Sequence, residues 1–189
     1  MSSLDHGAAC LLVTGAPGAG KSTVSRLVAA ALTRSALLRG DDVSRLVVSG
    51  HVWALGEPVD EAARQTRLCN DNLITLASSF ADAGFTPVID WVVPDRSQLD
   101  LYVEALGPRG LSLVVLDPGG EVCRDRNAQR DPEEQFHFDG HEPLVARMRA
   151  EFGEIGWWFD TSTLTPEETV EQVVDHAYAK GFVTYRRRL

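Results

Sequence analysis

The octapeptide Gly15-Ala16-Pro17-Gly18-Ala19-Gly20-Lys21-Ser22 has the pattern G-x-x-x-x-G-K-S. It follows an apolar run at 9–14 that has the length of a buried strand, and it precedes a segment with helical periodicity. A strand-to-helix turn of this pattern is typical of phosphate-binding loops, because its glycines let successive backbone N–H groups converge on one phosphate. A plain connecting turn would explain the glycines but not the adjacent Lys21 and Ser22. The sequence therefore predicts a nucleotide site here.

The chemistry of a nucleoside triphosphate assigns a role to each part of this loop. We expect Lys21 to bridge the β- and γ-phosphate oxygens of ATP, and Ser22 Oγ to bind Mg²⁺. ATP and Mg²⁺ are thus the predicted cofactors. The residues predicted to surround the nucleotide are Gly15, Ala16, Pro17, Gly18, Ala19, Gly20, Lys21, Ser22 and Thr23. The chain has no Asn-Lys-x-Asp motif for guanine, and its D-x-x-G sequence, 117–120, follows the fourth strand candidate, so we do not expect a switch GTPase.

Outside the loop, short apolar runs alternate with segments of helical period. The strand candidates are 9–14, 36–38, 87–93, 111–116 and 156–159. Strands that are apolar nearly throughout are typical of parallel sheets covered on both faces. A long helix is predicted over 60–83, and the last helix is expected to start at Thr165 with a capping box. The rhythm predicts an α/β fold with a parallel sheet and helices on both faces.

Size and composition limit the possible classes of protein. The chain has 189 residues and a net charge of −9, which fits one soluble domain spanning 1–189 and counts against nucleic acid as a partner. We find no apolar run of membrane-spanning length and no signal peptide, so the expected location is cytoplasmic and no membrane partner is expected. The spacing of Cys10, Cys69 and Cys123 suggests neither a disulfide nor a zinc site. The basic end, Arg186–Arg188, is interpreted as a solvated tail.

Two adjacent acids, Asp41 and Asp42, follow the second strand candidate. Ligands bind at the carboxyl edge of such sheets, so the two carboxylates are expected to face the phosphates. One of them could orient an acceptor hydroxyl and accept its proton. The alternative role is capping of a short helix that begins near Val43, and both roles can be divided between the pair. Asp90, at the third strand, is a further candidate for holding Mg²⁺ or the acceptor.

The polar segment 123–142 is predicted to contain a mobile lid. Within it Arg126 and Arg130 are four residues apart, so both can lie on one helical face and close over a transferring phosphoryl group. Their alternative role is surface pairing with neighbouring acids. Two histidines of this segment, His137 and His141, lack a third ligand at zinc spacing and are interpreted as lid or acceptor contacts.

These motifs together resemble a group of P-loop kinases that contains polynucleotide 5′-kinase, chloramphenicol phosphotransferase, gluconate kinase, adenylylsulfate kinase and zeta toxins. The resemblance covers the loop, the pair Asp41-Asp42 and the sequence Arg126-Asn127-Ala128-Gln129-Arg130. It implies a three-layer fold with a five-stranded parallel sheet and a lid between the fourth and fifth strands. The polynucleotide-kinase pattern implies Asp41 as the base, and the chloramphenicol-phosphotransferase pattern implies Asp42.

The function expected from this resemblance is transfer of the ATP γ-phosphate to a hydroxyl of a small molecule such as a sugar, nucleoside or antibiotic. Two alternatives stay open. A kinase of polynucleotide 5′-hydroxyl ends would share the motifs but would need a basic channel. A non-catalytic ATP-binding module would need neither the acidic pair nor the lid arginines. Trp53 and Trp91 are candidates for stacking on a planar acceptor, although core packing is their commoner role.

Overall fold

The computed structural model describes Leu4 and residues 9–133 and 135–184. In these residues one mixed sheet has the strand order β2-β3-β1-β4-β5, and β6 pairs with β4. The first five strands are parallel, and β6 is antiparallel to β4. The strands are β1 (Cys10–Gly15), β2 (Ser35–Arg39), β3 (Thr86–Asp90), β4 (Leu111–Leu116), β5 (Trp157–Phe159) and β6 (Phe182–Val183).

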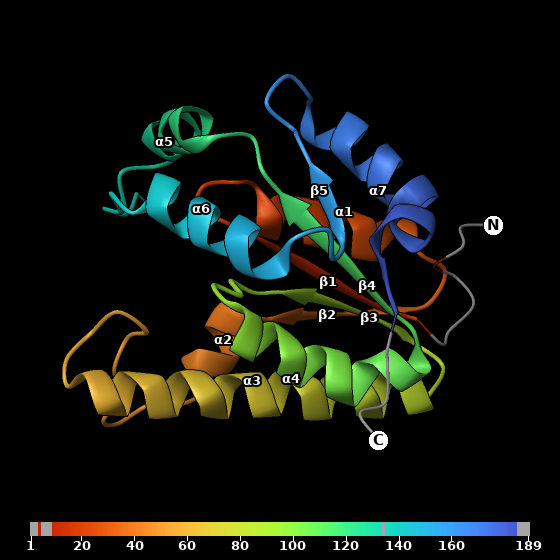
Figure 1. Ribbon diagram of the computed structural model, residues 1–189, viewed down its shortest axis with the longest axis horizontal. Helices are drawn as coiled ribbons and strands as arrows, with labels where there is room; N and C mark the ends of the chain where they lie inside the picture. Colours follow the sequence, from red (N-terminus) through yellow and green to blue (C-terminus); the bar gives the residue numbers. More distant parts are fainter. Residues whose placement is uncertain (1–3, 5–8, 134, 185–189) are drawn as a thin grey trace.

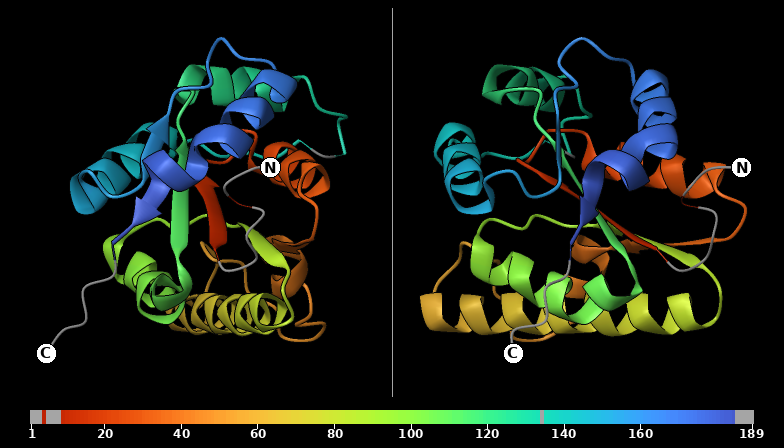
Figure 2. Two further views of the ribbon diagram at one scale, coloured as in Figure 1. Left: turned by 90° about the vertical axis from the view of Figure 1, so that its right-hand side faces the viewer. Right: turned by 45° about the vertical axis from the view of Figure 1, so that its right-hand side comes forward.

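Helices follow the parallel strands and cover the sheet (Figure 1). They are α1 (Lys21–Ala31), α2 (Gly40–Ser44), α3 (Val59–Asp82), α4 (Arg96–Leu106), α5 (Gly120–Ala128), α6 (His141–Phe152) and α7 (Pro166–Gly181), with a 3-10 turn at Gly107–Arg109. Helices α3 and α4 lie on one face of the sheet, and α1 and α7 lie on the other, as the two turned views of Figure 2 also show.

The alternation of side chains in β1 explains the two layers. Cys10 and Leu12 belong to the core under α3, α4 and α6, whereas Leu11 and Val13 belong to the core under α1 and α7. Because successive strand residues point to opposite faces, a strand that is buried on both faces must be apolar throughout. The predicted three-layer α/β fold with its parallel sheet is thereby confirmed.

Most predicted element boundaries are shifted by one residue, and the larger differences are at the third strand and at two elements that were not predicted. The third strand ends at Asp90 instead of residue 93, because Val93 N donates to the Thr14 side chain at 2.9 Å and the chain leaves the sheet. Helix α4, which begins at the N-cap Asp95, and the short strand β6 had not been predicted. The capping box of Thr165 and Glu168 at the start of α7 is confirmed. None of the helices among the described residues combines the length and the apolar composition that a membrane span requires.

Candidate functional site

The loop between β1 and α1 forms a cradle of backbone N–H groups. Gly18 and Gly20 have φ values of 83° and 99°, a region that glycine adopts without strain. A Cβ at Gly18 would lie 2.5 Å from the Cys123 carbonyl oxygen, so α5 packs directly against the loop. Helix α1 begins without a side-chain cap and without acids in its first turn, which leaves its N–H groups and its dipole open to an anion. These features fit the phosphates of ATP.

Lys21 lies at the base of the cradle. Its Nζ donates to the carbonyl oxygens of Gly15 and Ala16, at 3.1 and 3.0 Å. Burial lowers the pKa of this amine, while the negative charges of Asp90 and Asp41 oppose that shift. A cation held between backbone oxygens and two nearby carboxylates is placed to meet the β- and γ-phosphates.

Asp90 ends β3 beside this lysine. Burial raises the pKa of Asp90, and the nearby charge of Lys21 and a hydrogen bond with the Ser22 hydroxyl act against that rise. A hydroxyl and a carboxylate in contact are oxygen ligands of the kind that Mg²⁺ prefers. The predicted pair Ser22 and Asp90 therefore lies together and fits the ion.

The two acids of α2 lie in different environments. The charge of Asp41 acts on the pKa values of Lys21 and Asp90, and also on that of Cys69 on α3, so this exposed carboxylate lies within electrostatic range of the phosphate loop. Asp42 instead pairs with Arg39 at 3.5 Å and with Arg45 at 3.8 Å on the exposed side of the helix. Neither acid caps α2 with its side chain, because the N-cap of this helix is Arg39. Asp42 is thus paired with two arginines, whereas the charge of Asp41 acts on the buried groups of the phosphate loop.

The two predicted lid arginines do not share a helical face, because α5 ends at Ala128 and Arg130 lies beyond its C-cap Gln129. They also have separate partners. Arg126 donates to the carbonyl oxygens of Ala19 and Thr161, at 3.0 and 2.7 Å. The exposed Arg130 places its guanidinium 5.2 Å from the centre of the Phe136 ring, and its charge lowers the pKa of Lys21. Arg126 therefore holds the loop backbone, whereas Arg130 is exposed and packs its guanidinium beside the Phe136 ring.

The segment 123–142, which was predicted to contain a lid, is packed against the protein at both of its ends. Cys123 on α5 and His141 at the start of α6 are both buried, and His141 Nε2 lies 3.0 Å from the Pro17 carbonyl oxygen. The residues between α5 and α6, 129–140, form no helix or strand where they are described. Figure 1 shows α5 and α6 side by side. The exposed His137 pairs with Asp139 at 3.0 Å.

Sequence reasoning missed the structural roles of His141 and Thr161. The position of His141, one residue after Gly140 and at the first turn of a helix, carried no sign that its ring reaches a loop 124 residues away. Thr161 contributes only a backbone oxygen, which no side-chain pattern reveals.

The remaining candidates are placed as follows. Trp91 packs so closely on Gly40 that a Cβ there would lie 1.8 Å from its ring, and Trp91 belongs to the margin of the core. Trp53 is 59% exposed. The cysteines Cys10, Cys69 and Cys123 are buried. The basic end, Arg186–Arg188, lies outside the described residues.

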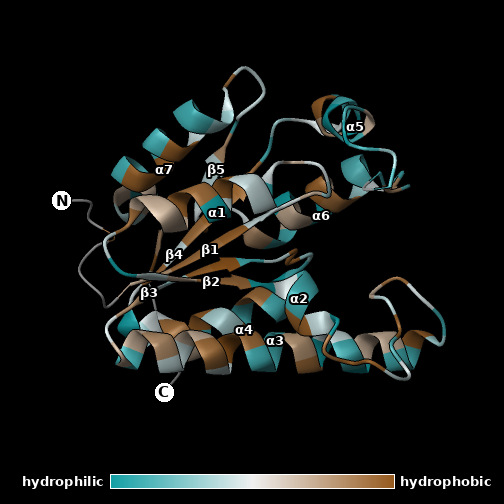
Figure 3. Cartoon of the chain, turned by 180° about the vertical axis from the view of Figure 1, so that it is seen from behind, coloured by the Kyte–Doolittle hydropathy of each residue, from teal (hydrophilic) through white to brown (hydrophobic). Residues whose placement is uncertain are grey.

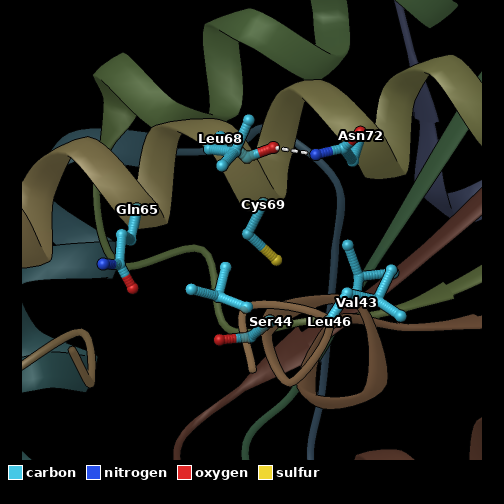
Figure 4. A pocket seen from close by; sticks show the side chains of 8 residues that line it. Val43, Ser44, Leu46, Gln65, Leu68, Cys69 and Asn72 are labelled. Carbon is cyan, nitrogen blue, oxygen red and sulfur yellow. Dashed lines mark hydrogen bonds between the residues drawn. The ribbon is translucent and has the colours of Figure 1, made fainter. Parts of the chain in front are cut away.

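A cavity of about 230 Å³ lies between α2 and α3. Val43, Ser44 and Leu46 form one side, and Gln65, Leu68 and Cys69 of α3 form the other (Figure 4). A second cavity of about 530 Å³ shares Val47, Gln65 and Leu68 with the first and continues along the N-terminal half of α3. The two cavities are therefore neighbours that share part of their lining.

Solved structures with the same architecture are sugar and small-molecule kinases and a resistance protein. A sugar kinase from Janibacter sp. HTCC2649 matches with a TM-score of 0.69 and 21% identity over 90% of this chain and 95% of its own. Shikimate kinase from Acinetobacter baumannii, in complex with shikimate, matches with a TM-score of 0.63 and 15% identity over 87% of this chain and 89% of its own. The tunicamycin resistance protein of Deinococcus radiodurans matches with a TM-score of 0.61 and 17% identity over 87% of this chain and 92% of its own.

No curated protein sequence matches the chain. A protein-family model does match, over residues 11–155, and it describes an AAA domain. This range contains the phosphate loop, both acids of α2, Asp90 and both lid arginines, and it covers well over half of the chain. The chain therefore belongs to the AAA domain family AAA_33, and its fold is that of the P-loop kinases.

Proposed function

We propose that the protein is an ATP-dependent kinase that transfers the γ-phosphate to a hydroxyl group of a small molecule. The observation that carries this proposal is the convergence of Lys21, Asp90 and Asp41 at the carboxyl ends of three neighbouring strands. A cation for the phosphates, oxygen ligands for a metal ion and a carboxylate for the acceptor are the groups that phosphoryl transfer requires.

Each group has a distinct part in the proposed reaction. The loop amides, the start of α1 and Lys21 bind the phosphates, and Ser22 and Asp90 hold Mg²⁺. Bound ATP supplies the transferable phosphoryl group, and Mg²⁺ reduces the charge repulsion on its oxygens. Asp41 orients the acceptor hydroxyl and accepts its proton. Arg130 stabilises the charge that develops on the phosphoryl oxygens.

A non-catalytic ATP-binding module is the main competing function. Such a module needs the phosphate loop but no carboxylate directed at the γ-phosphate position. The different surroundings of Asp41, whose charge acts on Lys21, and of Asp42, which pairs with surface arginines, favour the enzyme.

The decisive experiment measures acceptor-dependent release of ADP from ATP across pooled sugars, nucleosides, antibiotics and short oligonucleotides. We expect at least one small-molecule pool to stimulate release, and we expect Lys21→Ala to abolish most of it in a folded protein. Lys180→Ala is the matched control, because Lys180 is the other lysine of the chain and lies on α7 over the Trp157 ring. Unchanged turnover in the Lys21 variant would refute the proposal.

A further inference from the structure

We infer that the acceptor of this kinase is an uncharged molecule with a sizeable apolar part, and that this part binds in the cavity between α2 and α3. The inference rests on the proposed function, because it concerns the acceptor of the same site. It narrows the acceptor class from hydroxyl compounds in general to neutral amphiphilic ones. Four features of the cavity support it.

The first feature is the position of the cavity next to the proposed base. Val43 and Ser44, which line it, follow Asp41 and Asp42 on the same short helix. From the opposite wall the Cys69 thiol reaches the Gly40 carbonyl oxygen at 3.5 Å, and Gly40 precedes Asp41. In Figure 4 the sulfur atom points from α3 toward this helix. An apolar group in the cavity would therefore hold its own hydroxyl near the Asp41 carboxylate.

The second feature is that polar groups of the lining are used within the protein. Gln65 Nε2 donates to Gly50 O and Glu61 Oε1, both at 2.7 Å, and its Oε1 accepts from Val52 N. The Ser44 hydroxyl lies 3.1 Å from His51 Nε2. These bonds fasten the loop after α2 to both helices. The surfaces left to meet a ligand are then mainly the side chains of Val43, Leu46, Val47 and Leu68.

The third feature is the charge of the lining. Among the described residues that line the two cavities, Arg64 is the cationic one, and its guanidinium pairs with Glu61 at 3.0 Å. An acceptor with a carboxylate or phosphate group would need a cation in the lining that is not already paired with an acid. The lining favours a neutral acceptor.

The fourth feature is a set of exposed apolar side chains on the same loop and helix, of which Leu46 and Leu68 line the cavities. Leu46, Val48, Trp53, Leu55 and Val59 are each more than half exposed, and Leu68 is 51% exposed. They belong to the loop after α2 and to the N-terminal half of α3, where Figure 3 colours parts of the chain as hydrophobic. Exposed apolar side chains that surround a cavity are typical of a binding site for an apolar group.

Binding without ATP tests the inference separately from turnover. The probe is 2-(1-naphthyl)ethanol, a neutral alcohol with a fluorescent apolar ring, and the comparison ligands are glucose, which is neutral and polar, and shikimate, which is anionic. We expect the naphthyl alcohol to bind more tightly than both, and Leu68→Ser to weaken its binding by about five- to tenfold, because part of its apolar contact is lost. Thermal unfolding checks that each variant is folded.

Leu76→Ser is the matched control, because Leu76 lies on the same helix, is 38% exposed and does not line either cavity. Its affinity for the probe should equal that of the wild type. An equal loss of affinity for the probe in the Leu68 and Leu76 variants would overturn the inference. Tighter binding of shikimate than of the probe would also overturn it, as would a stable dimer that buries Trp53. If glucose or shikimate stimulates Lys21-dependent ADP release and neutral apolar alcohols do not, the kinase proposal stands and this inference fails. If the probe binds as expected but no acceptor stimulates release, the kinase proposal fails.

Discussion

Asp41 and Asp42 are chemically identical neighbours, so their difference in function must come from what surrounds each carboxylate. Asp41 lies near Lys21 and Asp90, and Asp42 is drawn to Arg39 and Arg45. We predict that Asp41→Asn keeps ATP binding but lowers kcat by about 10² to 10⁴, the scale of a lost general base. Steady-state kinetics with the stimulating acceptor measure this.

Asp42→Asn is the matched control for that prediction, with the same chemical change one residue away. Its kcat should stay within about twofold of the wild type, since exposed ion pairs contribute little. A large loss in the Asp42 variant with normal Asp41 kinetics would exchange the two roles.

Asp90 illustrates a cost in stability at a functional residue. Its raised pKa means that the folded protein binds the proton more tightly than the unfolded chain does. Stability therefore falls as the pH rises from the ordinary carboxyl value of 3.8 through the folded-state pKa, and it stays lower above that. We predict that Asp90→Asn raises the unfolding midpoint at pH 7, removes this pH-dependent fall and abolishes the Mg²⁺-dependent activity.

Asp95→Asn should instead lower the unfolding midpoint at pH 7. Although burial opposes it, a hydrogen bond from Gln98 N is the main cause that lowers the pKa of Asp95. Its stabilising contribution is present above the ordinary pKa and is lost as the pH falls through the folded value. A lower midpoint for Asp90→Asn at pH 7 would contradict the account of Asp90.

At this scale the sequence located the acids but could not choose between them. The pair after the second strand candidate is visible in the sequence, because strand ends and ligand sites coincide in α/β folds. Which carboxylate faces inward depends on the angle at which α2 leaves β2. The close packing of the Trp91 ring on Gly40 is a tertiary contact at the start of α2 that no local sequence pattern reveals.

The contact between α2 and the segment after β3 is an element-scale consequence of that packing. A methyl group at Gly40 would overlap the Trp91 ring, so we predict that Gly40→Ala destabilises the fold by about 1–3 kcal/mol, the usual cost of overpacking. Denaturant unfolding measures this. The double variant Gly40→Ala/Trp91→Leu should recover part of the loss, because the smaller side chain makes room. A double variant that is less stable by the full sum of both changes would exclude this contact as the cause.

Two arginines near the nucleotide site, Arg126 on α5 and Arg130 just beyond its C-cap Gln129, have different contacts. Arg126 holds the backbone of the phosphate loop, so we predict that Arg126→Ala raises the KM for ATP about tenfold, in line with the loss of charge-assisted hydrogen bonds. Arg130→Ala should instead lower kcat by about 10² with little change in that KM, because it removes a donor used in the transition state.

Arg124→Ala is the control on helix α5, since Arg124 pairs with Glu142 away from the loop. If the Arg126 and Arg130 variants both have wild-type kinetics, neither side chain contributes to ATP binding or to catalysis.

Elements were predictable where one signal dominated. The five parallel strands and the capped start of α7 followed from apolar runs and a capping box. Helix α4 also had a signal, because Leu99, Tyr102, Val103 and Leu106 repeat at helical spacing, but the strand candidate next to it masked its start. The two-residue strand β6 has no pattern of its own and forms only because β4 offers an edge. His141 under the loop is a tertiary contact without a local pattern.

For the whole molecule, the charge distribution bears on the acceptor class. The sequence has 27 acids and 18 lysines and arginines. Many described arginines pair with acids, among them Arg39 and Arg45 with Asp42, Arg67 with Asp71, and Arg109 with Asp82. A nucleic-acid kinase must neutralise several phosphates beside its site, and each such contact releases counterions, so its affinity falls steeply as salt rises. Cations that are already paired with carboxylates contribute little to this.

We therefore predict no submicromolar binding of a fluorescently labelled oligonucleotide with a free 5′-hydroxyl end at physiological salt. Fluorescence anisotropy at two salt concentrations measures the affinity and its salt slope, and transfer of labelled γ-phosphate to the 5′ end measures activity. A variant with Arg186, Arg187 and Arg188 replaced by alanine shows whether any residual affinity comes from the basic end. Tight binding with a steep salt slope that persists in this variant, or efficient 5′ labelling, would replace the small-molecule acceptor with a polynucleotide one.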